Sequence, residues 1–161
     1  HRRSSAASDV YKRQMFIQGL ETLALRVREH SKNADEIAKF LMDHPKVERV
    51  VHPSVASDLA KERADKYLSG GCGGLMGFEI KGGIEAGKQF INSLEMFYHV
   101  ANIGDSRSLA IHPASTTHSQ LNEEELLSAG VTPGYVRLSI GLEHLDDIKD
   151  DLTQALDKVS V

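Results

Sequence analysis

Residues 16–43 contain the longest helical pattern in the sequence. Apolar side chains recur there mostly at steps of three and four residues, which places them on one face of a helix. These residues are Leu20, Leu23, Val27, Ala34, Ile37, Ala38 and Leu41. Either one long helix or two helices with a bend near Ser31 fits the pattern. The pair His44-Pro45 ends it, because a residue before proline is pushed out of the helical region. Such an apolar face must be covered, so we expect a layered fold.

Beyond residue 46 the chain alternates between short strand-like and helical segments. Strands are predicted over residues 47–51, 75–80, 96–103, 108–111 and 135–140. Helices are predicted over residues 57–68, 83–94 and 145–159, with a short one between the cap residue Asn122 and Gly130. Gly104-Asp105 is expected to turn the chain between the third and fourth strands. This order predicts an α+β fold, a mainly antiparallel sheet covered by helices and preceded by a long helix.

The first fourteen residues, HRRSSAASDVYKRQ, differ in composition from the rest. They hold four basic residues against Asp9 alone and have no apolar periodicity. A basic arm or a targeting peptide would be a functional interpretation. We favour a disordered or non-native end, and we place the folded domain at residues 15–161.

Composition narrows the class of protein. The chain is 40% apolar and 26% charged, which is typical of one ordinary globular domain. A formal net charge of −4 argues against nucleic acid as a partner. No apolar run approaches the roughly 20 residues that a membrane span needs. The single cysteine, Cys72, allows no internal disulfide and fits a reducing compartment, so we expect a cytoplasmic protein.

Several short motifs could carry chemistry, but none is well supported by its spacing. The glycine-rich segment SGGCGGLMGFEIKGG leads into a strand, whereas phosphate-binding loops lead into a helix, so we interpret its glycines as a turn. His112 and His118 match no zinc-ligand spacing. Ser115, His118 and Asp105 could form a triad on paper, yet no G-x-S-x-G elbow occurs. We therefore expect no metal site.

Arg137 is the stronger candidate for a binding residue. In VRLSIG it shares one face of a strand with Tyr135 and Ser139, and the apolar residues take the other face. It could lie on the solvent face of the sheet. Alternatively, its guanidinium could bind a ligand's carboxylate through two charge-assisted hydrogen bonds. The pattern alone does not choose between these interpretations.

Five segments taken together resemble a known family. They are GLETLALRVREHSKNADEIAKFL, HPKVERVVHP, GGCGGLMGFEIKGG, ANIGDSRSLAIHPASTTHSQL and GVTPGYVRLSIGLEHLDDIKDDLTQAL. In this order, over residues 15–158, they resemble the C-terminal domain of the cystathionine γ-synthase family of pyridoxal-phosphate enzymes. The HPASTTHSQL and GDSRSL segments are the most specific and are similar to the branch that uses O-acetylhomoserine. GLETL and VRLSIGLE are shared more widely.

The resemblance implies the small C-terminal domain of a fold-type-I enzyme, which closes over an amino-acid substrate. Arg137 matches the arginine that holds the substrate's α-carboxylate, Asn102 stands beside that carboxylate, and Thr117 supports the same pocket. The larger N-terminal domain would carry pyridoxal phosphate, and the whole enzyme would be a homotetramer. The implied reaction is γ-replacement, in which sulfide or a thiol replaces acetate to give homocysteine or methionine.

The chain also departs from the family. None of its ten lysines lies in the Ser-x-Thr-Lys context of the Schiff-base lysine. The family's phosphate-binding glycine loop, ring-stacking tyrosine and pyridine-binding aspartate are missing too. We therefore expect an inactive C-terminal fragment without catalytic or cofactor-binding residues of its own. A methionine γ-lyase fragment, a cystathionine γ-synthase fragment and a free-standing interaction module remain alternatives.

Overall fold

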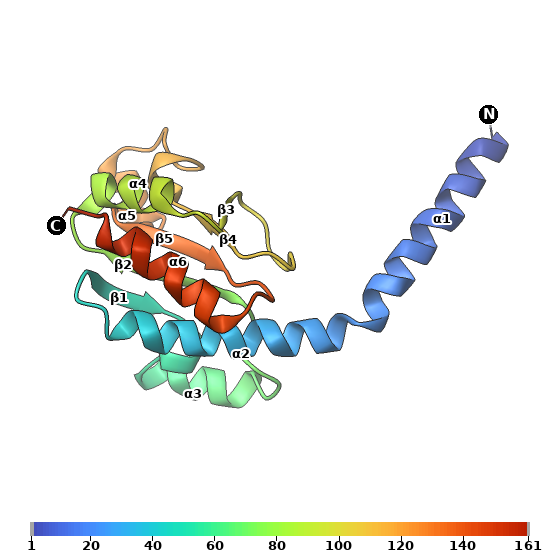
Figure 1. Cartoon of the computed structure of the whole chain (residues 1–161), viewed down its shortest axis with the longest axis horizontal. Helices are drawn as coiled ribbons and strands as arrows, with labels where there is room; N and C mark the ends of the chain where they lie inside the picture. Colours follow the sequence, from blue (N-terminus) through green and yellow to red (C-terminus); the bar gives the residue numbers. More distant parts are fainter. Residues whose placement is uncertain (1, 161) are drawn as a thin grey trace.

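A five-stranded sheet in the order β1-β2-β5-β4-β3 forms the middle layer of the described part of the chain (Figure 1). The structure is a computed structural model that describes residues 2–160, with the side chains of residues 9–57, 59–122 and 124–160. The strands are β1 Val47–Val51, β2 Leu75–Ile80, β3 Tyr98–His99, β4 Leu109–Ile111 and β5 Tyr135–Ser139. Strands β1, β2, β5 and β4 pair antiparallel, as the sequence predicted.

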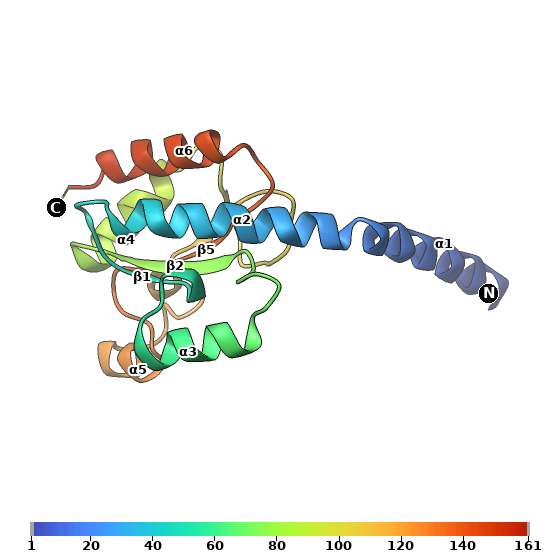
Figure 2. The same ribbon diagram turned by 90° about the horizontal axis from the view of Figure 1, so that it is seen from below.

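Helices lie on both sides of this sheet (Figure 2). The long helices are α1 Arg2–Glu21, α2 Leu23–Met42, α4 Gly83–Ser93 and α6 Leu145–Asp157, and the shorter ones are α3 Asp58–Tyr67 and α5 Glu123–Ser128. Two 3-10 turns, η1 Pro53–Val55 and η2 Pro113–Ser115, follow β1 and β4. Helices α2, α4 and α6 lie on one side of the sheet, whereas α3 and α5 lie on the other. The predicted α+β class is confirmed.

The main core lies between the sheet and the layer formed by α2, α4 and α6. Phe78 of β2 meets Phe90 of α4 edge to face, with ring centroids 5.3 Å apart. Val136 and Leu138 of β5 are fully buried in this core, as the alternation in VRLSIG predicted. Burying these side chains on one face fixes the register of β5 and turns its intervening residues to the opposite face.

Two local interpretations can be tested. Of the two alternatives for residues 16–43, the bend near Ser31 is wrong, because helix α2 runs unbroken through Ser31 and the break between α1 and α2 lies at Thr22. Ser31 is buried, and its hydroxyl accepts a 2.9 Å hydrogen bond from the Gly73 N–H, so the helix packs there and does not bend. Strands β3 and β4 are also parallel, not a hairpin, and β3 has only two residues.

The connection between β3 and β4 explains the second error. Gly104 has a positive φ of 72°, and the Asp105 carboxylate accepts the Arg107 N–H at 3.0 Å, so a local turn does form. The rest of the loop is held by the segment after β5, where the Leu142 N–H donates to the Ser106 carbonyl at 2.8 Å. This distant contact, which no local pattern encodes, sets the path of residues 100–108.

Helix α1 extends away from the sheet (Figure 1). From residue 9 to residue 21 every residue is exposed except Gly19, which is half-buried. The structure has a helix from Arg2 onward, which the alanines, arginines and lysine of this segment favour. That residues 1–14 are a disordered or non-native end stays a prediction. Residue 1 and the side chains of residues 2–8 lie outside the described set. No helix within the described residues is long and apolar enough to cross a membrane.

Candidate functional site

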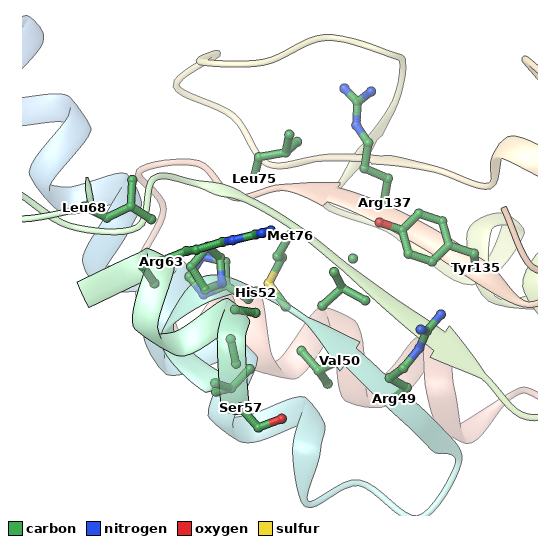
Figure 3. A pocket seen from close by; sticks show the side chains of 17 residues that line it. Arg49, Val50, His52, Ser57, Arg63, Leu68, Leu75, Met76, Tyr135 and Arg137 are labelled. Carbon is green, nitrogen blue, oxygen red and sulfur yellow. The ribbon is translucent and has the colours of Figure 1, made fainter. Parts of the chain in front are cut away.

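A groove of about 840 Å³ opens on the face of the sheet that α2, α4 and α6 leave uncovered (Figure 3). Strands β1, β2 and β5 form its floor, and helix α3 with the turn η1 forms one wall. Most of its lining is apolar, from residues such as Val51, Leu75 and Met76. Its polar side chains include three arginines, one histidine and one tyrosine, which are Arg49, Arg63, Arg137, His52 and Tyr135.

The strand register places Arg137 and Tyr135 in two neighbouring rows of residues across this face. Val51, Gly77 and Arg137 lie opposite one another on β1, β2 and β5. Arg49, Glu79 and Tyr135 form the next row. Residues two apart on a strand share a face, so Arg137 and Tyr135 both face the groove. The prediction that these two side chains share a face is confirmed.

Arg137 holds a positive charge that its surroundings do not balance. Its Nη2 donates a 2.9 Å hydrogen bond to the backbone carbonyl of Asn102. Among the described residues no carboxylate lies within ion-pairing distance of it. A carbonyl oxygen is a neutral acceptor, so the guanidinium keeps both its charge and most of its donors for a ligand.

Arg49 shows how a cation in this groove is neutralised. It lies 3.3 Å from the Glu79 carboxylate, which is only 13% exposed. The Thr132 hydroxyl also donates to Glu79. Glu79 therefore pairs with Arg49 and Thr132, and no ion pair joins it to Arg137 among the described residues. The contrast makes Arg137 the better candidate for binding an anionic ligand.

The ring of Tyr135 lies over Gly77, and the absence of a side chain at Gly77 makes this position possible. A Cβ built at Gly77 would overlap the ring and the hydroxyl of Tyr135. In Figure 3 the hydroxyl points toward the middle of the groove. Burial raises the pKa of this phenol above its ordinary value, and the nearby Arg137 and Arg49 only partly oppose the rise. The hydroxyl therefore keeps its proton at neutral pH and can donate it to a hydrogen bond.

The other two predicted binding residues are placed differently from Arg137. Asn102 is brought to Arg137 through its backbone carbonyl, and its own side chain is exposed outside the groove lining. Thr117 is exposed as well, and its hydroxyl pairs with Nδ1 of His118 at 2.9 Å. The structure thus joins Asn102 to Arg137 and leaves Thr117 apart from the groove lining. A role for either side chain in ligand binding stays a prediction.

Ser115, His118 and Asp105 are not brought together as a triad. The Ser115 hydroxyl instead pairs with Nδ1 of His112 at 2.8 Å. Nε2 of His112 donates to the Pro133 carbonyl at 2.8 Å, which assigns the proton of the neutral ring to that nitrogen. His112 is fully buried and therefore stabilises the loop between β4 and α5. In the described part of the chain no three metal-binding side chains come together.

Sequence reasoning gave no role to Tyr135 or Gly77. Tyr135 was placed on the same face as Arg137, but no motif marked it as a binding residue. The available signal was the glycine in the middle of β2, because a strand glycine often marks a close approach of another group. Only the register of β2 against β5 shows which side chain makes that approach.

Comparison with known proteins gives consistent matches. The sequence model of the Cys/Met metabolism PLP-dependent enzyme family matches residues 2–157. An O-acetyl-L-homoserine sulfhydrylase from Leptospira meyeri is 56% identical over 145 residues, covering 89% of this chain and 33% of that protein. An L-methionine gamma-lyase from Fusobacterium nucleatum subsp. polymorphum is 43% identical over 89% of this chain and 36% of its own length.

A solved structure shares the fold. It is a putative O-acetylhomoserine (thiol)-lyase from Campylobacter jejuni that contains N'-pyridoxyl-lysine-5'-monophosphate. The two chains are 48% identical with a TM-score of 0.81, over 87% of this chain and 33% of that one. The present chain therefore spans about a third of the length of these relatives.

Proposed function

Since the chain belongs to the Cys/Met metabolism family of PLP-dependent enzymes, we propose that it is the substrate-binding C-terminal part of an O-acetylhomoserine sulfhydrylase. In this reaction sulfide or a thiol replaces the acetate of O-acetylhomoserine, which gives homocysteine or methionine and free acetate. The sulfhydrylases among the relatives support this choice, with identities of 56% and 48% for those from Leptospira meyeri and Thermus thermophilus. The complete enzyme would be a cytoplasmic homotetramer, as the family resemblance implies.

The groove fits an amino-acid substrate better than it fits the attachment of the cofactor. Pyridoxal phosphate is attached through a lysine amine, and none of the described residues that line the groove is a lysine. When bound, this cofactor accepts the electron pair released at the substrate's α-carbon. We propose that its attachment lies in the part of the enzyme that this chain does not span. The chain alone would then show no turnover.

Arg137 supports this proposal most strongly. Arg137 lines an apolar groove, and its guanidinium is directed to the loop at the edge of that groove, where a carboxylate can form two charge-assisted hydrogen bonds in place of the single bond to the Asn102 carbonyl. The apolar floor would contact the substrate's methylene groups. Arg137 would thus orient the substrate and act on positioning, while the bond-breaking steps need the rest of the enzyme.

The proposal can be tested in a hybrid enzyme, defined as the Leptospira meyeri sulfhydrylase with its matching third replaced by this chain. Two charge-assisted bonds of about 1.5–3 kcal/mol each predict that Arg137→Ala lowers kcat/KM for O-acetylhomoserine at least about 100-fold, mainly through KM. Arg137→Lys keeps the charge without the planar guanidinium, so its kcat/KM should lie between those of the unsubstituted hybrid enzyme and Arg137→Ala. Arg28→Ala, at an exposed position of α2, is the control. An unchanged KM in Arg137→Ala would contradict the proposal.

The lyase alternative is supported by the 43% identity to the Fusobacterium enzyme. A lyase would eliminate methanethiol from methionine without needing a second substrate. Supplying the complete enzyme to which this chain belongs, in place of the hybrid, with O-acetylhomoserine and sulfide, and separately with methionine alone, compares the two reactions. Faster turnover of methionine would favour the lyase, whereas homocysteine formation as the faster reaction supports the sulfhydrylase.

A further inference from the structure

We propose that the hydroxyl of Tyr135 is a second substrate-binding group, and that it favours amino acids with an ester oxygen in the side chain over those with a thioether. This inference rests on the function proposed above, because it takes Arg137 as the site of the α-carboxylate. It adds a residue that would determine specificity within the same groove.

The first support is the position of the hydroxyl relative to Arg137. Gly77 lies directly opposite Arg137 in the register of β2 and β5. The Tyr135 hydroxyl occupies the space that a side chain at Gly77 would fill. Neighbouring strands lie about 5 Å apart, so the hydroxyl lies roughly one strand spacing from the base of the Arg137 side chain. One ligand a few bonds long can therefore reach both groups.

The second support is that the hydroxyl has no fixed partner. Within the described residues it makes no hydrogen bond, although Tyr135 is half-buried. The other two residues of the row that contains Tyr135 do have partners. Arg49 pairs with Glu79, and Glu79 also accepts a hydrogen bond from the Thr132 hydroxyl. The hydroxyl is open to the groove, so a ligand acceptor can bind it without breaking a hydrogen bond within the protein.

The third support is the chemistry of the floor around the hydroxyl. With its carboxylate on Arg137, a ligand would lay its side chain across Gly77 toward Val51 and Leu75. These residues contact methylene groups without distinguishing them. The Tyr135 hydroxyl is the donor that lies along this path. An ester carbonyl is a good acceptor for it, whereas a thioether sulfur is a weak one.

The test uses Tyr135→Phe in the hybrid enzyme, because phenylalanine keeps the ring over Gly77 and removes only the hydroxyl. One neutral hydrogen bond predicts a fall of about threefold to tenfold in kcat/KM for O-acetylhomoserine. The kcat/KM for methionine should fall less than twofold. L-norleucine has the carboxylate but no side-chain oxygen. Its inhibition constants for the hybrid enzyme and for the Tyr135→Phe variant should therefore agree within about twofold.

Gly77→Ala is the second variant, since its methyl group must displace the tyrosine ring. It should reduce the preference for O-acetylhomoserine over methionine by the same factor as Tyr135→Phe, and combining the two substitutions should reduce this preference no further. Equal losses for both substrates in Tyr135→Phe, or no loss at all, would overturn the inference. If Arg137→Ala weakens binding and Tyr135→Phe leaves the preference unchanged, only this inference fails. If Arg137→Ala has no effect, the proposed function fails with it.

Discussion

At the scale of single residues, Glu143 controls the surroundings of Arg137 although it lies outside the groove. Its carboxylate accepts the Ser108 N–H at 2.6 Å and the Ser108 hydroxyl at 2.9 Å. The Ser108 hydroxyl in turn accepts the Gly141 N–H at 2.9 Å. These bonds fasten the end of the Asn102 loop to the segment that follows β5. The same loop carries the Asn102 carbonyl that accepts the hydrogen bond of Arg137.

We predict that Glu143→Ala destabilises the domain by about 2–4 kcal/mol, because the buried N–H and hydroxyl of Ser108 lose a charged acceptor. In the hybrid enzyme the same change should raise KM for O-acetylhomoserine several-fold. Glu143→Gln keeps one acceptor oxygen and should lose less. Urea unfolding followed by circular dichroism, with steady-state kinetics, measures both effects. Unchanged stability in Glu143→Ala would show that these bonds contribute little.

Buried histidines make stability depend on pH. Burial lowers the pKa of His44, His52 and His112, and for His112 the nearby Lys88 and His99 lower it further while its bond to Pro133 opposes the change. The unfolded chain therefore binds protons near pH 6.5 that the folded chain does not bind. We predict that the unfolding free energy falls as the pH drops from about 7.5 to 5.5. His112→Gln should reduce this slope, because it removes one of the groups whose pKa burial lowers. A slope of zero in the unsubstituted chain would contradict the prediction.

At the scale of elements, local sequence patterns correctly predicted the features that depend on neighbouring residues alone. The predicted bounds of β1 and β2 match the structure, and Asn122 with Glu125 forms the predicted capping box at α5. The strand predicted over residues 96–103 shrank to Tyr98–His99, because only these two residues pair with β4. The parallel direction of β3 and the register of Gly77 against Arg137 are likewise set by pairing across the sheet.

Helix α2 holds the end of β5 in place. The Asn33 side-chain amide donates to the carbonyls of Gly141 and Glu143, both at 3.2 Å, and Asn33 is buried. Nδ1 of His30 donates to the Ile140 carbonyl at 2.6 Å. We predict that Asn33→Ala lowers the unfolding free energy by about 1–3 kcal/mol, because two buried carbonyls lose their donor. Asn92→Ala, on the exposed side of α4, is the matched control. Equal thermal stability of the two variants would contradict this role of α2.

At the scale of the whole molecule, the sequence placed Arg137 on the correct face but could not show the groove. Its floor comes from β1, β2 and β5, and its wall from α3 and η1, so it exists only once segments far apart in the sequence are packed. The sequence also could not show that Arg49 pairs with Glu79, whereas Arg137 has no such partner within the described residues. Burial and pairing across the sheet, not residue types, distinguish these arginines.

The exposed apolar side chains of α1 predict self-association of the isolated chain. Tyr11, Met15 and Phe16 are 68–71% exposed on a helix that extends from the domain. Apolar surface of this kind favours covering by another protein surface. Light scattering of the isolated chain should show association that rises with concentration, and removal of residues 1–21 should reduce it. A monomer at every concentration would favour the free-standing interaction module instead.

The most direct test of the account is a crystal structure of the hybrid enzyme with L-norleucine bound. We predict that both carboxylate oxygens of the ligand lie within hydrogen-bond distance of the Arg137 guanidinium, with the aliphatic chain passing over Gly77 toward Val51. The bond from Arg137 to the Asn102 carbonyl should be replaced or shared. A ligand bound elsewhere, with the guanidinium facing bulk water, would contradict the account.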